Sequence, residues 1–308
     1  MRRYWWYRAA GVILALLPAL GAEALVRVVT TTPDLAALAR EVGGEQVEVT
    51  AIVNGLQDPH YVEAKPTHIR RLNRADLLIY NGMELEIGWL PLLIEGSRNP
   101  RLLPGSLGLM DASEAVEVKL EVPQGEVDRS QGDVHPLGNP HYLLDPRNGV
   151  QVARAIAERL GQIDPDHQKS YLARAERFAE EMAERIARWE RETEVLRGLE
   201  VIAYHRTWSY LSAWLGFHVV GYFEEKPGIP PGPRHLAILE SLVRSRGVQV
   251  ALAAHYNPLR GLEAFARRAG IRLVVLPASV EAREDVRSYP ELFDRIVLTL
   301  REAFGEGS

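Results

Sequence analysis

The longest amphipathic pattern in the chain constrains its architecture most. Between Pro165 and Arg197, apolar residues recur at steps of three, four and seven, as on one face of an α-helix: Tyr171, Ala175, Phe178, Met182, Ile186, Trp189 and Leu196. Asp164 is placed to act as N-cap, and Gly198 follows the segment. At 1.5 Å per residue such a helix is roughly 50 Å long, more than the width of a small domain. We therefore interpret it as a rigid connection between two bodies rather than a coiled coil, because the stripe stops after about four heptads.

Length, charge and cysteine content narrow the classes of protein to consider. A chain of 308 residues is long enough for two globular lobes, each with its own core. Its net charge of −5 gives no reason to expect nucleic acid as a partner. The chain has no cysteine, which excludes disulfides, thiolate metal sites and a lipid anchor on an N-terminal cysteine.

The N-terminus has the features of a secretory signal peptide, which we place at residues 1–24. Three arginines at positions 2, 3 and 8 precede an apolar run over residues 9–20, and Ala22 and Ala24 provide the small residues of a cleavage site. The alternative is an uncleaved anchor, because residues 4–6 extend the apolar segment towards membrane length. We predict an exported, soluble mature chain that is retained in a periplasm.

Strand and helix patterns alternate after the signal peptide. Apolar, valine-rich runs at residues 25–30, 46–53 and 75–80 predict strands, and residues 33–42 and 67–74 predict the helices between them. The order βαβαβ favours a mostly parallel sheet with helices on its faces. Residues 119–138 are polar, hold three glycines and two prolines, and predict a long surface loop.

The same order of elements returns after the long helix. A strand at residues 201–204 is followed by a helix, Gly216 and a strand at 218–223, and another strand is predicted at 248–254. The fold class is therefore α/β, with two similar lobes joined by one long helix. We place the N-terminal lobe at residues 25–145, the connecting helices at 146–198 and the C-terminal lobe at 199–308.

Three histidines stand in loops where α/β sheets place their ligands. His60 follows the predicted strand that ends at Val53, His141 lies between the polar loop and a helix, and His205 follows the strand at 201–204. If the carboxyl ends of strands from both lobes face one cleft, the three imidazoles converge there. Neutral imidazoles suit a borderline metal ion, above all Zn²⁺.

Other polar residues have supporting or unrelated roles in this interpretation. Asp58, Glu63 and Asp145 are close enough in sequence to accept the second ring N–H of a ligand histidine. His135, in the polar loop, is expected to be solvated, with passage of metal inward as the alternative, and His255 is a possible extra ligand. Four further histidines are not expected to bind metal, because they lie at helix starts, in an exposed helical turn or at a strand start: His68, His235, His167 and His218.

These residues lie in motifs that resemble the three histidine motifs of the solute-binding proteins of zinc and manganese ABC importers. The matching segments are QDPHYVEAKP at residues 57–66, NPHYLLDP at 139–146 and AYHRTWSY at 203–210. The segment GYFEEKPGIPPGP at 221–233 also resembles one branch of that family. The resemblance implies a monomeric, non-enzymatic protein that holds one metal between its lobes through His60, His141 and His205. It also implies delivery of that metal to a membrane permease driven by a cytoplasmic ATPase.

The fourth metal ligand departs from the family pattern. Many relatives carry an aspartate near the C-terminus, but the matching stretch here, VLPASVEA at residues 275–282, has none. Water, Glu281, His255 and a carboxylate beside His60, such as Asp58, remain alternatives. Three histidines favour zinc over manganese, because carboxylates are the harder ligands that manganese prefers.

Two other functions deserve comparison with metal capture. A secreted zinc hydrolase also uses three histidines and an open water position, but it needs a general base, and the chain has no HExxH motif. A surface adhesin finds little support without a lipid anchor. The sequence therefore predicts a binding protein, with the hydrolase as the alternative.

Overall fold

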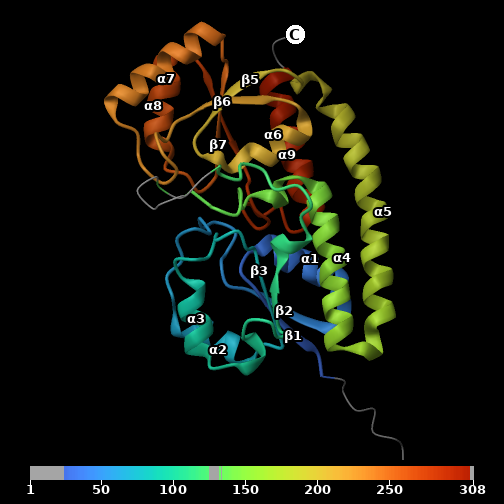
Figure 1. Ribbon diagram of the computed structural model, residues 1–308. Coiled ribbons are helices and arrows are strands. Elements are labelled where there is room, and N and C mark those ends of the chain that lie inside the picture. The colour runs from blue at the N-terminus through green and yellow to red at the C-terminus, as the bar shows by residue number, and fades with distance from the viewer. Residues whose placement is uncertain (1–23, 125–131, 133, 306–308) are drawn as a thin grey trace, which may run out of the picture.

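The computed structural model describes residues 24–124, 132 and 134–305, and these form two lobes beside one long helix (Figure 1). The predicted signal peptide lies outside the described residues except for Ala24. Among the helices of the described part, none is long and apolar enough to cross a membrane.

The N-terminal lobe is built on a four-stranded parallel sheet of order β2-β1-β3-β4. The strands are β1 (Val26–Thr30), β2 (Val47–Ala51), β3 (Leu77–Tyr80) and β4 (Leu109–Asp111). Three helices belong to this sheet, α1 (Pro33–Gly43), α2 (Pro66–Arg74) and α3 (Leu90–Ser97). Both faces of the sheet are covered by helices (Figure 1), which explains the continuous apolar run of the central strand β3, whereas the edge strand β2 alternates between apolar and polar residues.

The C-terminal lobe repeats this topology, with a parallel sheet of order β6-β5-β7-β8. Its strands are β5 (Glu200–Ala203), β6 (His218–Tyr222), β7 (Val250–Ala254) and β8 (Arg272–Leu276). Its helices are α6 (Ser209–Leu215), α7 (Pro233–Arg246), α8 (Leu259–Ala269) and α9 (Tyr289–Gly305). The predicted fold class, two similar parallel α/β lobes, is confirmed.

Two antiparallel helices connect the lobes, α4 (Pro146–Ile163) and α5 (Gln168–Glu192). The long helix is shorter than predicted: α5 has 25 residues, about 37 Å, and Pro165–His167 and Glu194–Leu196 are 3-10 turns. Asp164 stands at the predicted N-cap position, with Pro165 next to it, but its side chain makes no capping hydrogen bond. Its carboxylate instead accepts a hydrogen bond from the Tyr171 hydroxyl at 2.6 Å, so it is not available to the first helical N–H groups. Further 3-10 turns occur at Gly44–Gln46, Pro100–Leu102, Ala112–Ala115, Tyr142–Leu144 and Arg206–Trp208.

The apolar stripe of α5 packs against both lobes. Its members are buried, apart from the partly buried Ile186. In the first half of α5, Arg174 donates to the carbonyl of Glu41 at 2.7 Å, in the N-terminal lobe. In the second half, the Trp189 indole donates to Asp294 of α9 at 2.9 Å, in the C-terminal lobe. The inner faces of both sheets and α5 thus share one hydrophobic core, as expected of a rigid connection.

The lobes also meet directly along a polar seam. Asp34, at the start of α1, accepts a hydrogen bond from the backbone N–H of Val280 at 3.0 Å. Gly55 approaches the opposite lobe so closely that a Cβ there would lie 2.3 Å from the carbonyl carbon of Glu281. A larger residue at position 55 would therefore push the lobes apart.

Candidate metal centre

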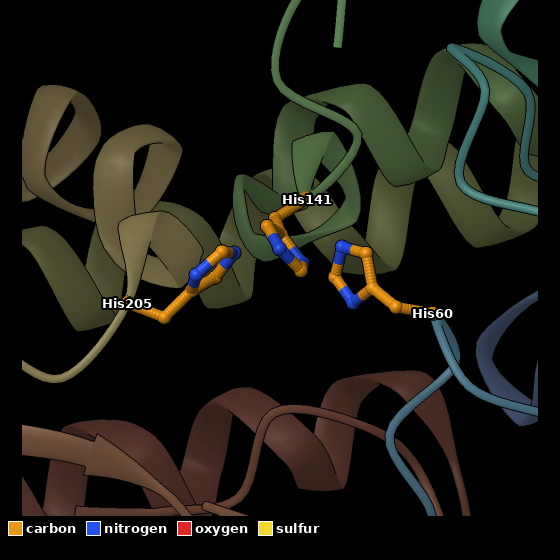
Figure 2. Close-up of side chains that lie close together, drawn as sticks. All are labelled: His60, His141 and His205. Atoms are coloured by element: carbon orange, nitrogen blue, oxygen red, sulfur yellow. The ribbon is translucent and has the colours of Figure 1, made fainter. Parts of the chain in front are cut away.

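Three loops bring His60, His141 and His205 together between the lobes (Figure 2). The first lies in the loop after β2, the second precedes the 3-10 turn before α4, and the third follows β5 by two residues. The ring centroids form a nearly equilateral triangle: 5.3 Å from His60 to His141, 5.5 Å from His60 to His205 and 5.5 Å from His141 to His205. The predicted convergence of the three side chains is therefore present in the structure.

One nitrogen from each ring is directed to a common centre. These three atoms all lie within 4.8 Å of one another. In a tetrahedral site with Zn–N bonds of about 2.0–2.1 Å, neighbouring nitrogens are about 3.4 Å apart, so binding requires a contraction of at most roughly 1.4 Å. The Nε2 atoms of His60 and His141 are buried without a hydrogen-bond partner, which is costly unless another species occupies the centre. The donor set fits a transition-metal ion.

Asp58 orients the ring of His60. Its Oδ1 lies 2.7 Å from His60 Nδ1 and also accepts the backbone N–H of the same residue at 3.0 Å. With Nδ1 as the donor, Nε2 presents its lone pair to the centre. Burial by itself would raise the pKa of the Asp58 carboxyl, but the hydrogen bond and charge of His60 hold that pKa below its usual value. The Trp89 indole donates to the carbonyl of Pro59 at 3.1 Å and anchors the loop.

Glu224 plays the same part for His205. Its Oε2 lies 2.7 Å from His205 Nδ1 and accepts the backbone N–H of Gly228 at 3.1 Å. The residue follows β6 by two positions, and β6 pairs with β5 so that Tyr222 is opposite Ala203. Residues 205 and 224 therefore emerge side by side. Glu224 was not among the predicted site residues, although two parallel strands that end just before a histidine and a glutamate were the signal for it.

His141 is held by its own loop and by the N-terminal sheet. Its backbone N–H donates to Asn139 Oδ1 at 2.9 Å, and the carbonyl of Pro140 accepts from Asn81 Nδ2 at 2.9 Å. Burial, together with the neighbouring His60 and His205, lowers the pKa of His141 well below its ordinary value. This imidazole is therefore neutral at physiological pH, the form that binds a metal.

The side chains that were candidates for a fourth ligand make other contacts in the structure. Glu281 lies 3.9 Å from Arg40 in an exposed pair, and Asp58 supports His60 from behind. His255 Nε2 lies 2.6 Å from the carbonyl oxygen of Gly55, so this ring bridges the lobes. In the described residues, the group that could hold a metal contains the three histidines alone.

Two of the three predicted orienting carboxylates point elsewhere. Asp145 caps α4 through the N–H of Arg147 at 3.0 Å, and Glu63 lies 3.8 Å from Lys65. Both are near a histidine in sequence, but a loop can turn neighbouring side chains in opposite directions. Asp58 alone has the role that was predicted for it.

The prediction that His135 is solvated is wrong. Its ring is partly buried, and its centroid lies 5.4 Å from that of His60. It lines both a cavity of about 260 Å³, shared with His141 and His205, and an open vestibule of about 950 Å³ in front of His60. The described end of this loop, around His135, therefore lies at the site.

The remaining histidines lie outside the centre. The ring of His167 is within 2.8 Å of Asp164, and His235 Nε2 is 3.0 Å from the carbonyl of Tyr222. His68 is buried in α2, where burial and then the nearby Arg71 and Lys65 lower its pKa, and His218 is exposed at the start of β6.

Comparison with known proteins agrees with the geometry in indicating a metal-binding protein. The family model for ZnuA, described as zinc-uptake complex component A periplasmic, matches residues 28–303. Among solved structures, a crystal structure of ZnuA has a TM-score of 0.77 at 20% identity and covers 91% of this chain and 100% of that chain. The solute-binding protein FpvC from Pseudomonas aeruginosa in complex with Mn²⁺ has a TM-score of 0.75 at 21% identity and covers 92% and 100%. At these identities the structures establish the fold alone.

Curated relatives include metal-binding lipoproteins of streptococci. The manganese ABC transporter substrate-binding lipoprotein scaA of Streptococcus gordonii is 29% identical over 160 residues, 51% of this chain and 48% of the relative. PsaA of Streptococcus pneumoniae, also described as a manganese ABC transporter substrate-binding lipoprotein, is 29% identical over 161 residues, with coverage of 51% and 48%. The chain spans about half the length of the curated relatives it matches.

Proposed function

We propose the function of this chain from the premise that it belongs to the ZnuA family, the metal-binding solute-binding proteins that serve as periplasmic components of zinc-uptake ABC importers. The chain captures one divalent transition-metal ion between its lobes through His60, His141 and His205. The observation that carries this proposal is the convergence of three imidazoles, two of which bury an Nε2 without a hydrogen-bond partner.

Zinc is the cargo that this donor set favours. The three imidazoles are neutral donors of intermediate softness, and no carboxylate belongs to the group of converging donors in the described residues. Asp58 and Glu224 supply two negative charges directly behind His60 and His205, and these balance the charge of a divalent ion in a buried site. Because the streptococcal relatives are named for manganese, the preference for zinc over manganese has to be measured.

Solvent completes the coordination in this proposal. Glu281, His255 and Asp58 are held by other contacts, and the vestibule in front of His60 is open. A fourth position filled by water leaves the ion accessible for transfer. Release of the ion therefore does not require a fourth bond to a protein side chain to be broken.

The partner is a membrane permease of a metal ABC importer with its cytoplasmic ATPase, and the place of action is the periplasm. The family description and the predicted signal peptide support this assignment. A solute-binding protein must be exported to carry an ion to a permease from outside the cytoplasm.

A hydrolase is disfavoured as an alternative, because the family consists of solute-binding proteins and the carboxylates near the centre have other tasks. The Asp58 carboxylate is bound to His60 and the Glu224 carboxylate to His205 and Gly228, so neither is directed at a metal-bound water as a general base.

The test compares metal binding with turnover in the purified mature chain. We expect one zinc ion per chain, tighter binding of zinc than of manganese, and no hydrolysis of generic ester or phosphate substrates with zinc bound. Zinc-dependent turnover would sink the transport function in favour of the hydrolase. Tighter binding of manganese would keep the capture function and reverse the choice of metal.

A pH series adds a second measurement on the same site. Ligand imidazoles must be neutral, and free histidine has a pKa of about 6.5. We therefore expect zinc affinity to weaken as the pH falls below about 6 to 6.5, because protons compete with the metal. An affinity that stays constant from pH 7.5 to pH 5 would contradict a site made of three histidines.

A further inference from the structure

One carboxylate outside the metal centre joins the two segments that carry His141 and His205. Glu121 Oε1 accepts hydrogen bonds from Ser209 Oγ at 2.9 Å and from Arg206 Nη1 at 3.2 Å. Its Oε2 accepts from Asn139 Nδ2 at 2.9 Å. Arg206 directly follows His205, and Asn139 precedes His141 by two residues. The carboxylate thus contacts both lobes within two residues of their metal-binding side chains.

Asn139 completes this link on the other side. The residue is 5% exposed, and its Nδ2 also donates to the carbonyl of Arg206 at 2.7 Å. Its Oδ1 accepts the backbone N–H of His141 at 2.9 Å. A continuous hydrogen-bonded path therefore runs from the backbone beside His205 to the backbone of His141, with Glu121 bracing it. We call Glu121, Asn139, Arg206 and Ser209 the bracket.

The backbone at Glu121 has a conformation that residues with a side chain rarely adopt. Its φ angle is +54°, in the left-handed region that side chains other than Gly and Asn disfavour. Such a conformation persists when surrounding contacts determine it, and here three donors converge on the carboxylate. The neighbouring Leu120 is also tied to the C-terminal lobe, because its N–H donates to the Tyr210 hydroxyl at 3.0 Å.

We propose that Glu121 is a positioning residue that, through Asn139 and Arg206, fixes the spacing of the His141 and His205 imidazoles and thereby favours a small tetrahedral ion over a larger one. This inference rests on the proposed metal-binding function. Zn²⁺ takes four ligands with bonds of about 2.0–2.1 Å to nitrogen, whereas Mn²⁺ suits oxygen donors in an octahedral arrangement. A rigid pair of rings discriminates between these geometries, and a loosened pair tolerates both.

The variants are Glu121→Ala, Glu121→Gln and a matched control, Glu200→Ala. Glu200 pairs with Arg246 at 2.7 Å, and its side chain is 27% exposed, against 30% for Glu121, but it lies at the opposite end of β5 from His205. The probes are Zn²⁺, Mn²⁺ and Co²⁺ alone. The readouts are the ratio of zinc to manganese affinity and the visible absorption of bound Co²⁺, which is intense only in a tetrahedral field.

We expect Glu121→Ala to lower zinc affinity about tenfold, the effect typical of residues that orient metal ligands, and manganese affinity less. The affinity ratio then falls and the Co²⁺ bands weaken, Glu121→Gln lies between, and Glu200→Ala matches the unmodified chain. If Glu121→Ala does not fold, Glu121→Gln carries the same comparison. An unchanged ratio and spectrum in a zinc-binding protein would overturn this inference alone. A lack of zinc binding by the unmodified chain would overturn it together with the proposed function.

Discussion

The two lobes orient their metal-site histidines by different means. In the N-terminal lobe, His60 is held by Asp58, two residues earlier in the same loop. In the C-terminal lobe, His205 is held by Glu224, 19 residues away at the end of the neighbouring strand. The Asp58 side chain is 30% exposed and the Glu224 side chain 10%. One lobe uses a local loop contact, and the other uses the pairing of β5 with β6.

This difference separates two kinds of support for one site. A local contact depends on a few residues and survives small movements of the sheet. A contact between strands transmits any change in strand pairing to the ligand, and Glu224 also holds Gly228 at the edge of the vestibule. The C-terminal ligand is therefore the more tightly integrated of the two.

The largest expected effect is the loss of a ligand itself. We expect His60→Ala, His141→Ala and His205→Ala each to lower zinc affinity by at least about 100-fold, because each removes one of three donors. His68→Ala is the control, since this histidine is buried in α2 away from the centre. Competition with a chromophoric chelator measures the affinities. If His68→Ala matched His60→Ala, the assignment of the N-terminal ligand would be wrong.

The second effect concerns the orienting carboxylates and tests the comparison directly. Loss of such a partner typically reduces metal affinity 10- to 100-fold. We expect Glu224→Ala to fall near about 100-fold and Asp58→Ala near about tenfold, because Glu224 is more buried and also holds Gly228. Glu240→Ala, at an arginine-paired carboxylate on α7, controls for loss of charge. Equal losses for Glu224 and Asp58 would remove the distinction between the lobes.

The third effect concerns the seam where the lobes meet. Burial raises the pKa of Asp34 to about 7, and the hydrogen bond from Val280 opposes part of that rise. A folded-state pKa above the unfolded value means that this group's stabilisation is full at low pH and is lost as the pH rises through about 7.

The test is urea unfolding of the metal-free chain at pH 6 and pH 8. Relative to Asp34→Asn, we expect the wild type to lose up to about 1.4 kcal/mol of unfolding free energy between these values. Glu86, whose pKa burial also raises to about 7, is common to both proteins and cancels in the difference. Parallel pH profiles would show that Asp34 does not titrate in this range.

The smallest effect is the change of shape on metal binding. The stiff pair of helices α4 and α5 and a shared core connect the lobes, so we expect small tilts and loop movements instead of wide opening. Small-angle scattering should give the same radius of gyration for metal-free and zinc-bound protein within error. A large closure on zinc addition would contradict the mechanical role of α5 and the direct contact between the lobes.

Much of the fold follows from local patterns in the sequence. The apolar stripe around Phe178 and Met182 determines a helix with one buried face, and valine-rich runs such as Val26–Thr30 determine buried parallel strands. The repeated order of elements predicts two lobes of the same topology. His60, His141 and His205 could be chosen because each follows a strand or precedes a helix and stands in a motif that resembles a known family, and Asp58 was a candidate because it stands two residues from His60.

Other features were decided by tertiary contacts that no short window contains. The Asp164 side chain makes no capping hydrogen bond because its carboxylate accepts from Tyr171, and His135 is partly buried because its ring lies beside that of His60. Glu224 and Glu121 reached the site through strand pairing and a contact between lobes. The sequence by itself therefore determined the elements and the three candidate histidines, since these depend on periodicity, on residue chemistry and on recognisable motifs. Only the tertiary structure decided which carboxylates support those side chains, because a hydrogen bond depends on positions in space that residues far apart in the chain acquire together.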